Sequence, residues 1–291
     1  MKSAIHKNKG FSLVELLIAM AVASIIMGLI YNTYQAQQKS YTAQHLAVEM
    51  QQNIRAAMSL IKREIRMAGY DPITSDGIDN DLDTNVDEND ETSNAGILSA
   101  AGNFIEFSFD NDADGSVDTA SNEHLTYGFT TGDADLDGIA NAGAESLSRI
   151  DTGGGVTEII AYDIQGIAFA YAFDDDGDGQ LDTSPGGNVI WAMDTDDDDL
   201  LDSVLDDTDN GVIDAADAEG GFPLVPAFWT NTVPTNNIRA VRIWMLARSR
   251  VPVRGFSDNN TYVVGAARVN SNDGFPRRLL VDTVNCRNMG L

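Results

Sequence analysis

KGFSLVELLIAMAVASIIMGLIY, residues Lys9–Tyr31, is the stretch that decides the architecture of the N-terminal part of this chain. About twenty apolar or small residues follow Gly10, enough to cross the hydrocarbon core of a bilayer as a helix, and Glu15 is the only charge among them. The lysines before this segment favour a cytoplasmic N-terminus. We therefore expect a single-pass membrane anchor with a cytoplasmic N-terminus.

Glu15 separates this segment from an ordinary signal anchor, because a carboxylate inside a membrane helix is costly without a partner. A secretory signal peptide is also disfavoured, since no A-x-A-type cleavage site follows and the helical pattern continues past the apolar run. The segment therefore predicts that another group neutralises the Glu15 carboxylate.

The stretch KGFSLVELLIA, Lys9–Ala19, resembles the type III signal of type IV prepilins and of type II secretion pseudopilins. This resemblance implies that a membrane aspartyl peptidase cuts between Gly10 and Phe11 and then N-methylates Phe11. It also implies that Glu15 meets the positively charged amine of Phe11 on an adjacent subunit during assembly. Such an ion pair would offset the desolvation of the carboxylate.

One long helix is expected to carry the chain out of the membrane. Gly28 is the only glycine between Phe11 and Ala68, and no proline occurs there, so a helix of roughly 55 residues is expected. Beyond the membrane, apolar residues recur at steps of three and four: Ala47, Met50, Ile54, Ala57, Ile61, Ile65 and Ala68. This stripe is expected to pack on the globular part of the chain, whereas helices of other subunits would cover the upper half.

The chain is accordingly divided into four parts. Residues 1–10 form the leader, 11–34 the transmembrane helix that would lie in a filament core, 35–70 its amphipathic continuation, and 71–291 an extracytoplasmic globular domain rich in strands and acidic loops. Gly69, followed by Asp71 and Pro72, predicts the end of the helix.

Short apolar segments with strand character follow the helix. They are Asn103–Phe109, Leu125–Phe129, Thr157–Tyr162, Gly166–Phe173, Asn188–Met193, Ile238–Ala247 and Tyr262–Val269. A helix followed by strands of this kind predicts an α+β fold with an antiparallel sheet. Pilin-like folds have this layout, with the sheet packed on the lower half of the long helix.

The charge of the chain is concentrated in its middle. Of 45 acidic residues, 39 lie between Asp71 and Glu219, where Arg149 is the only basic residue, and the formal net charge is −27. The segment from Gly220 to Leu291 is basic, with nine arginines against three aspartates. Nucleic acid is disfavoured as a partner because the acidic middle would repel phosphates. Divalent cations are the more natural counter-ions.

Three aspartate-rich loops repeat the pattern D-x-D-x-D-G. In such loops alternate carboxylates turn inward, the glycine allows a sharp turn and the next carbonyl adds a ligand, which together suit Ca²⁺. The expected ligands are Asp110, Asp112, Asp114, Ser116 and Asp118; Asp133, Asp135, Asp137, Ile139 and Asn141; and Asp174, Asp176, Asp178, Gln180 and Asp182.

These loops depart from an EF-hand, which would have a glutamate at the twelfth position and helices on both sides. Ser121, Ala144 and Pro185 hold the twelfth position instead. Two stretches match less well, and a solvated acidic surface remains the alternative for all of them. The weaker stretches are Asp79, Asp81, Asp83, Asp87 and Asp90, and Asp194, Asp196, Asp198 and Asp202, where Asp199 replaces the glycine.

No enzyme signature is found in the sequence. The chain has no HExxH, GxSxG or GxxxxGK[ST] motif, and its histidines are His6, His45 and His124. Cys286 is the only cysteine, so an intrachain disulfide is excluded, and a buried apolar role is favoured for it. We therefore expect a protein that is not an enzyme.

The closest resemblance is to PilW-type minor pilins. It rests on Gln37–Gln44 (QQKSYTAQ), Met50–Pro72, the acidic Asp76–Asp81 (DGIDND) and Arg277–Leu291 (RRLLVDTVNCRNMGL). The resemblance implies a structural subunit that helps to initiate a type IV pilus and sits at or near its tip. Its implied partners are other major and minor pilins, the prepilin peptidase and the inner-membrane assembly platform. It also implies that the chain first spans the inner membrane with its globular domain in the periplasm and then moves to the pilus at the cell surface. The alternatives are a GspJ-like minor pseudopilin of a type II secretion system and a calcium-dependent adhesive tip protein.

Overall fold

The computed structural model describes residues 11–71, 95–112, 117, 122–217, 229 and 231–290. The chain divides into two compact units, Met1–Leu46 and Ala47–Leu291. Helix α1 (Leu13–Ile65) contributes to both units. Each unit is described by itself.

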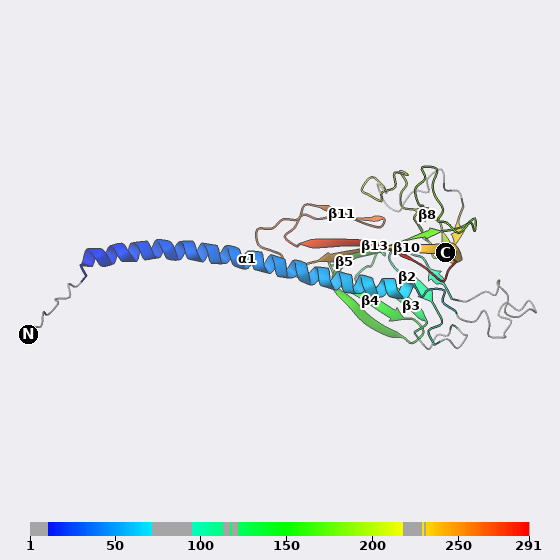
Figure 1. Cartoon of the computed structure of the whole chain (residues 1–291), viewed down its shortest axis with the longest axis horizontal. Coiled ribbons are helices and arrows are strands. Elements are labelled where there is room, and N and C mark those ends of the chain that lie inside the picture. The colour runs from blue at the N-terminus through cyan, green and yellow to red at the C-terminus, as the bar shows by residue number, and fades with distance from the viewer. Residues whose placement is uncertain are drawn as a thin grey trace, which may run out of the picture. The chain divides into compact units, whose positions relative to one another are not determined.

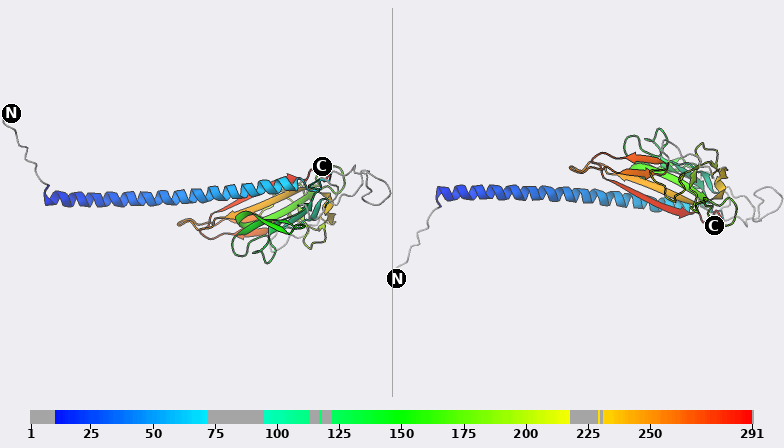
Figure 2. Two further views of the ribbon diagram at one scale, coloured as in Figure 1. Left: turned by 90° about the horizontal axis from the view of Figure 1, so that it is seen from below. Right: turned by 90° about the horizontal axis from the view of Figure 1, so that it is seen from above.

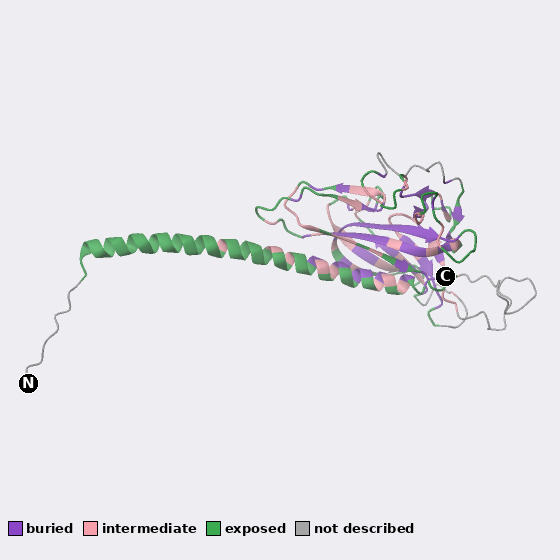
Figure 3. Cartoon of the chain, turned by 45° about the horizontal axis from the view of Figure 1, so that its top comes forward, coloured by how far each residue is buried: buried purple, intermediate pink, exposed green. Residues whose placement is uncertain are grey.

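The described part of the N-terminal unit is formed mainly by the first part of α1. Helix α1 is the one helix of the described residues that is long and apolar enough to cross a membrane, and it contains an 18-residue stretch with a mean hydropathy of 2.6. Its large apolar side chains are exposed along the whole stretch, as the green part of the helix in Figure 3 shows. No other described part of the same subunit therefore covers this apolar surface.

The helix begins with a capping box formed by Ser12 and Glu15. The Ser12 amide donates to Glu15 Oε2 over 2.8 Å, and the Glu15 amide donates to Ser12 Oγ over 3.2 Å. These reciprocal bonds satisfy two amides that an α-helix leaves open at its N-terminus. Glu15 thus has a local partner within the subunit, in addition to the partner on a neighbouring subunit that the sequence resemblance implies.

In the second unit, the part of α1 after Leu46 packs along the sheet, as Figures 1 and 2 show. The side chains that it buries form a stripe at helical spacing: Met50, Ile54, Ala57, Met58, Ile61 and Ile65. All members of the predicted stripe from Met50 onward are buried, including Ala68, which lies just beyond the helix. The stripe buries apolar area against the domain of its own chain, which stabilises both.

The main sheet is antiparallel and has nine strands, with the order β1-β2-β3-β4-β5-β10-β13. Of its two further short strands, β6 pairs with β5 and β8 pairs with β6. Its strands are β1 (Ile97–Ser99), β2 (Ile105–Ser108), β3 (His124–Phe129), β4 (Glu145–Asp151), β5 (Val156–Phe173), β6 (Ala192–Met193), β8 (Ser203–Val204), β10 (Ile238–Arg248) and β13 (Arg277–Asn285). Two small sheets pair β7 (Leu200–Leu201) with β9 (Val233–Pro234), and β11 (Thr261–Val264) with β12 (Ala267–Asn270). A 3-10 turn, η1 (Thr235–Asn237), precedes β10.

The predicted α+β class is confirmed, with differences in individual strands. The two predicted strands Thr157–Tyr162 and Gly166–Phe173 form one strand, β5, which continues through residues 163–165. Asp163 has a left-handed backbone with a φ of 59°, and the pairing of β5 with β4 and β10 shifts register around it. The predicted strand Tyr262–Val269 is instead the hairpin β11–β12, which turns at Gly265 with a φ of 58°. Of Asn188–Met193, only Ala192–Met193 is in a strand. Strands β1, β4 and β13, and the two-residue strands β7, β8 and β9, were not predicted.

A polar contact joins α1 to the middle of the sheet. Glu64 Oε2 accepts from Arg149 Nε over 2.9 Å and from the Tyr127 hydroxyl. Burial and the Glu64 charge raise the pKa of Tyr127 well above its usual range, so this hydroxyl stays protonated as a donor. Arg149, the only basic residue in the acidic middle, is therefore used to hold the helix on the sheet.

Replacing Glu64 with Gln should lower the free energy of unfolding by about 1–3 kcal/mol, because the largely buried Arg149 would lose its charged acceptor. The measurement is a urea titration of the full-length chain in detergent. Arg63→Gln is the matched control, since the Arg63 side chain is 74% exposed, and it should change the free energy by less than about 0.5 kcal/mol. Equal effects of the two variants would contradict this role of Glu64.

Candidate functional site

The loop Asp174–Asp182 follows β5 directly and folds around the carboxylate of Asp174. Asp174 Oδ1 accepts from the Gly177 amide over 2.8 Å, and Oδ2 accepts from the Gly179 amide over 2.9 Å. Asp182 Oδ2 accepts from the Asp175 amide over 2.9 Å, which closes the loop. Gly177 and Gly179 have φ values of 72° and 80°, a left-handed backbone that glycine adopts without strain.

The result of this folding is a group of inward-facing carboxylates. One oxygen each of Asp174, Asp176 and Asp178 lies within 4.8 Å of the other two. Asp174 is buried, whereas Asp176 and Asp178 are exposed. The loop therefore brings together the three aspartates that the sequence had assigned to it.

The loop Asp133–Asn141 has the same hydrogen-bond pattern. Asp133 Oδ2 accepts from the Gly138 amide over 2.9 Å, and Asp133, Asp135 and Asp137 bring one oxygen each within 4.8 Å of one another. Asn141, at the ninth position, closes this loop: its Nδ2 donates to Asp135 Oδ1 over 2.9 Å and its Oδ1 accepts from the Ala134 amide. The side chain of Asn141 thus closes its loop as Asp182 closes the loop after β5.

The loop Asp194–Asp202, which the sequence placed among the weaker matches, has the same geometry. Asp194 Oδ2 accepts from the Asp199 amide over 3.0 Å, and Asp194, Asp196 and Asp198 form a third group of oxygens within 4.8 Å. Asp199 adopts the left-handed backbone of the missing glycine, with a φ of 65°. Aspartate tolerates this conformation better than most residues, which explains why the loop forms without the glycine.

The loop that begins at Asp110 is described only in part, since Asp114, Ser116 and Asp118 lie outside the described residues. Asp110 and Asp112 meet Glu123, a residue that the sequence had not singled out, with one oxygen each within 4.8 Å. The weaker stretch with Asp79, Asp81, Asp83, Asp87 and Asp90 also lies outside the described residues.

A further loop of the same kind, Asp206–Asp217, was missed in the sequence. Asp206 Oδ2 accepts from the Gly211 amide over 2.7 Å, and Asn210 and Gly211 take the fifth and sixth positions. The twelfth position holds Asp217, which accepts from the amide and hydroxyl of Thr208. A search that allowed Thr and Asn at the third and fifth positions would have found the pattern D-x-T-x-N-G-x-x-D-x-x-D.

The carboxylates of these loops crowd one another. Burial raises the pKa of Asp133 and Asp137, and repulsion from Asp135 adds to both increases. In the third loop, repulsion from Asp198 raises the pKa of Asp196. Like charges held this close favour protonation or a bound cation.

The donor set indicates which cation fits. The groups of oxygens contain carboxylates and no histidine or cysteine among the described residues, so they suit hard cations rather than zinc. Backbone amides hold the first aspartate of the loop 174–182 in place. The second and third aspartates of the loops 133–141, 174–182 and 194–202 are exposed, so a cation from solvent can reach them. Flexible sets of oxygens on a tight turn match Ca²⁺ better than the strict octahedron of Mg²⁺.

The predicted processing site is described on one side only. Phe11 is 89% exposed, and Gly10 lies outside the described residues. Glu15 takes part in the capping box already described.

Cys286 is buried, in agreement with the apolar role favoured for it, and burial raises the pKa of its thiol to about 12. Of the basic C-terminal arginines, Arg242 stacks over Trp191 at 4.1 Å and Arg250 pairs with Asp163 at 3.1 Å.

Comparison with known proteins gives matches over the N-terminal half of the chain. Residues 5–31 match the prokaryotic N-terminal methylation motif. Residues 43–169 match prepilin peptidase-dependent protein B. No curated protein matches the chain.

Among solved structures, the chain is similar to a type IV-like pilin, TTHA1219, from Thermus thermophilus. The sequence identity is 13% and the TM-score is 0.41, over 84% of this chain and 100% of that one. The methylation motif at residues 5–31 and the match at residues 43–169 make this chain similar to prepilin peptidase-dependent, type IV pilin-like proteins.

Proposed function

We propose that this chain is a minor subunit of a type IV pilus, of the PilW kind, that helps to initiate the filament and lies at or near its tip. The observation that carries the proposal is the prepilin-type motif at residues 5–31 on a helix whose apolar surface is exposed along its first part. Prepilin peptidase would cut after Gly10 and N-methylate Phe11, and the exposed helix would then pack among those of other pilins. Pilin-like families are structural, and no catalytic role is proposed.

Glu15 gives the sharpest test of this role. In the subunit, its carboxylate caps the helix through the Ser12 amide, and in the filament it would pair with the Phe11 amine of a neighbour. Glu15→Ala should leave membrane insertion and cleavage intact and reduce piliation at least about tenfold, because an unpaired amine would remain in the apolar filament core.

The readouts are immunoblots for cleavage and electron microscopy for pili. Thr33→Ala is the matched control, since its side chain bonds to the Leu29 carbonyl of the same helix. Normal piliation in the Glu15 variant would overturn the assembly role. A GspJ-like pseudopilin shares the same signal, and loss of secreted enzymes without loss of pili in a deletion strain would identify that alternative instead.

We also propose that the aspartate loops bind Ca²⁺ and that bound calcium orders these loops. The support is the repeated geometry of the loops 133–141, 174–182 and 194–202, and we include the loop Asp206–Asp217. An adhesive role would follow if surface attachment were lost in chelator while pili remained.

A further inference from the structure

A pocket of about 680 Å³ lies in the second unit, and four separate segments and one residue of β5 form its walls. They are residues 101–104, residues 135–137, residues 193–197, the β11–β12 turn with residues 264–268, and Ala168. A volume of this size falls within the range of ligand-binding pockets. Two of the walls belong to the aspartate loops 133–141 and 194–202, so the pocket depends on how these loops are folded.

The pocket has an apolar part and an acidic part. Phe104, Ala266 and Ala267 contribute accessible apolar surface, and Asp135 and Asp197 contribute carboxylates. Both carboxylates belong to exposed residues. A ligand that matches both parts has an apolar body and a positive charge.

Leu136, in the pocket wall, combines an exposed apolar side chain with an unusual backbone conformation. Its side chain is 65% exposed and its backbone has a φ of 57°, a left-handed conformation in which a leucine is strained. Gly177 takes the same position in the loop 174–182 without strain. The leucine at the pocket wall is therefore strained in backbone conformation, and it adds exposed apolar surface to the wall.

The charge of the pocket stays negative even when calcium is bound. The wall holds Asp135, Asp137, Asp194 and Asp197 against a single cation, Arg268. One Ca²⁺ would leave the three carboxylates of the loop 133–141 with a charge of −1 and the six of the loop 194–202 with a charge of −4. Asp197 is outside the proposed ligand set, and its Oδ1 accepts from the Ser99 hydroxyl over 3.0 Å. A negative cleft with apolar walls concentrates cations.

We propose that this pocket binds a short basic segment of a partner protein, with a lysine or arginine stem along Leu136 and Phe104 and the charged head at Asp197 and Asp135. Long basic side chains bury their aliphatic stems while the head stays polar, and charge-assisted hydrogen bonds to carboxylates are strong. The volume exceeds that of one side chain, so a neighbouring apolar residue also fits. This inference rests on the proposed role as an assembled subunit, which supplies the partner.

The test uses full-length chain in zwitterionic detergent and fluorescently labelled peptides, with binding read by anisotropy. The basic probe is Leu-Lys-Leu-Arg-Leu, and the matched probes replace both basic residues with Gln or with Glu. We expect saturable binding of the basic probe and at least tenfold weaker binding of the other two. Equal binding of the three probes would overturn the proposal.

Two variants locate the binding at this pocket. Leu136→Gly removes the apolar wall in a backbone that glycine prefers, so folding is preserved, and Asp197→Asn removes one charge. Each should raise the Kd of the basic probe at least fivefold. Val251→Gly removes an exposed apolar side chain elsewhere and should leave the Kd unchanged. Unchanged binding in both pocket variants would overturn the assignment to this site.

Terbium luminescence, recorded on the same samples, reports the aspartate loops directly. Terbium binding without probe binding would refute the pocket and leave the calcium proposal standing. Probe binding without terbium binding would support the pocket and refute the calcium proposal. Neither probe anisotropy nor terbium luminescence depends on piliation. Both can therefore be interpreted even if the Glu15→Ala variant has normal piliation.

Discussion

Saturating Ca²⁺ should raise the melting temperature of the full-length chain by at least about 5 °C, and EDTA should reverse the change. A ligand at one hundred times its Kd stabilises the native state by about 2.7 kcal/mol per site, and about 1 kcal/mol shifts the melting temperature of a domain of this size by 2–4 °C. The physical reason is the crowding of Asp174, Asp176 and Asp178, whose repulsion a divalent cation would remove. The measurement is calorimetric titration with thermal melts alongside.

Asp174 and Asp175 provide a matched pair of variants for this prediction. Asp174→Asn removes the carboxylate around which the loop 174–182 folds, and it should lower the number of bound ions by one. Asp175 has its side chain outside the oxygen group and accepts from Asn237 Nδ2 over 3.1 Å, so Asp175→Asn should retain all ions. Mg²⁺ should stabilise the chain much less. No heat of binding and no shift in melting temperature would contradict the calcium proposal.

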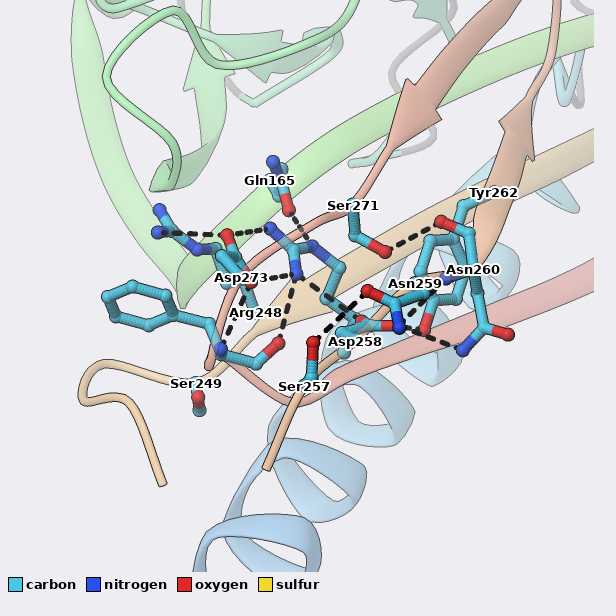
Figure 4. Close-up of polar contacts among 12 residues, drawn as sticks. Gln165, Arg248, Ser249, Ser257, Asp258, Asn259, Asn260, Tyr262, Ser271 and Asp273 are labelled. Atoms are coloured by element: carbon cyan, nitrogen blue, oxygen red, sulfur yellow. Dashed lines mark hydrogen bonds and ion pairs between the residues drawn. The ribbon is translucent and has the colours of Figure 1, made fainter. Parts of the chain in front are cut away.

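Replacing Arg277 with Met should lower the free energy of unfolding by about 3–5 kcal/mol, since it removes one partner of a buried ion pair. The Arg277 side chain is 3% exposed and that of Asp258 is 1% exposed. Arg277 also forms two parallel bonds to Asp273, of 2.7 and 2.8 Å, and donates to Gln165 Oε1 over 2.6 Å. Figure 4 shows the polar contacts around Gln165, Asp258 and Asp273, with Asn260 and Tyr262 beside Asp258.

Arg278 is the matched control, because it is the next residue in β13 and is exposed. Arg278→Met should change the free energy of unfolding by less than about 0.5 kcal/mol. Similar losses in the two variants would show that β13 responds to any change of charge and that the network has no special role. Urea titration monitored by tryptophan fluorescence measures both.

The same network predicts a dependence on pH. The hydrogen bonds and charge of Arg277 lower the pKa of Asp273 to about 2. A lowered folded-state pKa contributes stability that is present above the unfolded-state value of about 4 and is lost as the pH falls toward 2. The wild-type chain should therefore lose stability over this interval more steeply than Arg277→Met does, and urea titrations at several pH values test this.

The long helix and the aspartate loops could be predicted from the sequence because both depend on contacts between residues close in the chain. The helix needs an apolar run without proline. Each loop needs a first aspartate that accepts from amides three to five residues later, as Asp194 does even with Asp199 in place of glycine. The loop Asp206–Asp217 was missed only because Thr208 and Asn210 replace aspartates.

The tertiary structure decided what depends on distant parts of the chain. Strand β13 lies at one end of the main sheet, beside β10. Its charged residues kept it from being predicted as a strand, because the acceptor of Arg277 is Gln165, which lies 112 residues earlier in the chain. The pocket likewise joins the loops 133–141 and 194–202 with the β11–β12 turn. Local periodicity fixes a helix or a loop, whereas the pairing of strands and the walls of a pocket are set by packing across the whole domain.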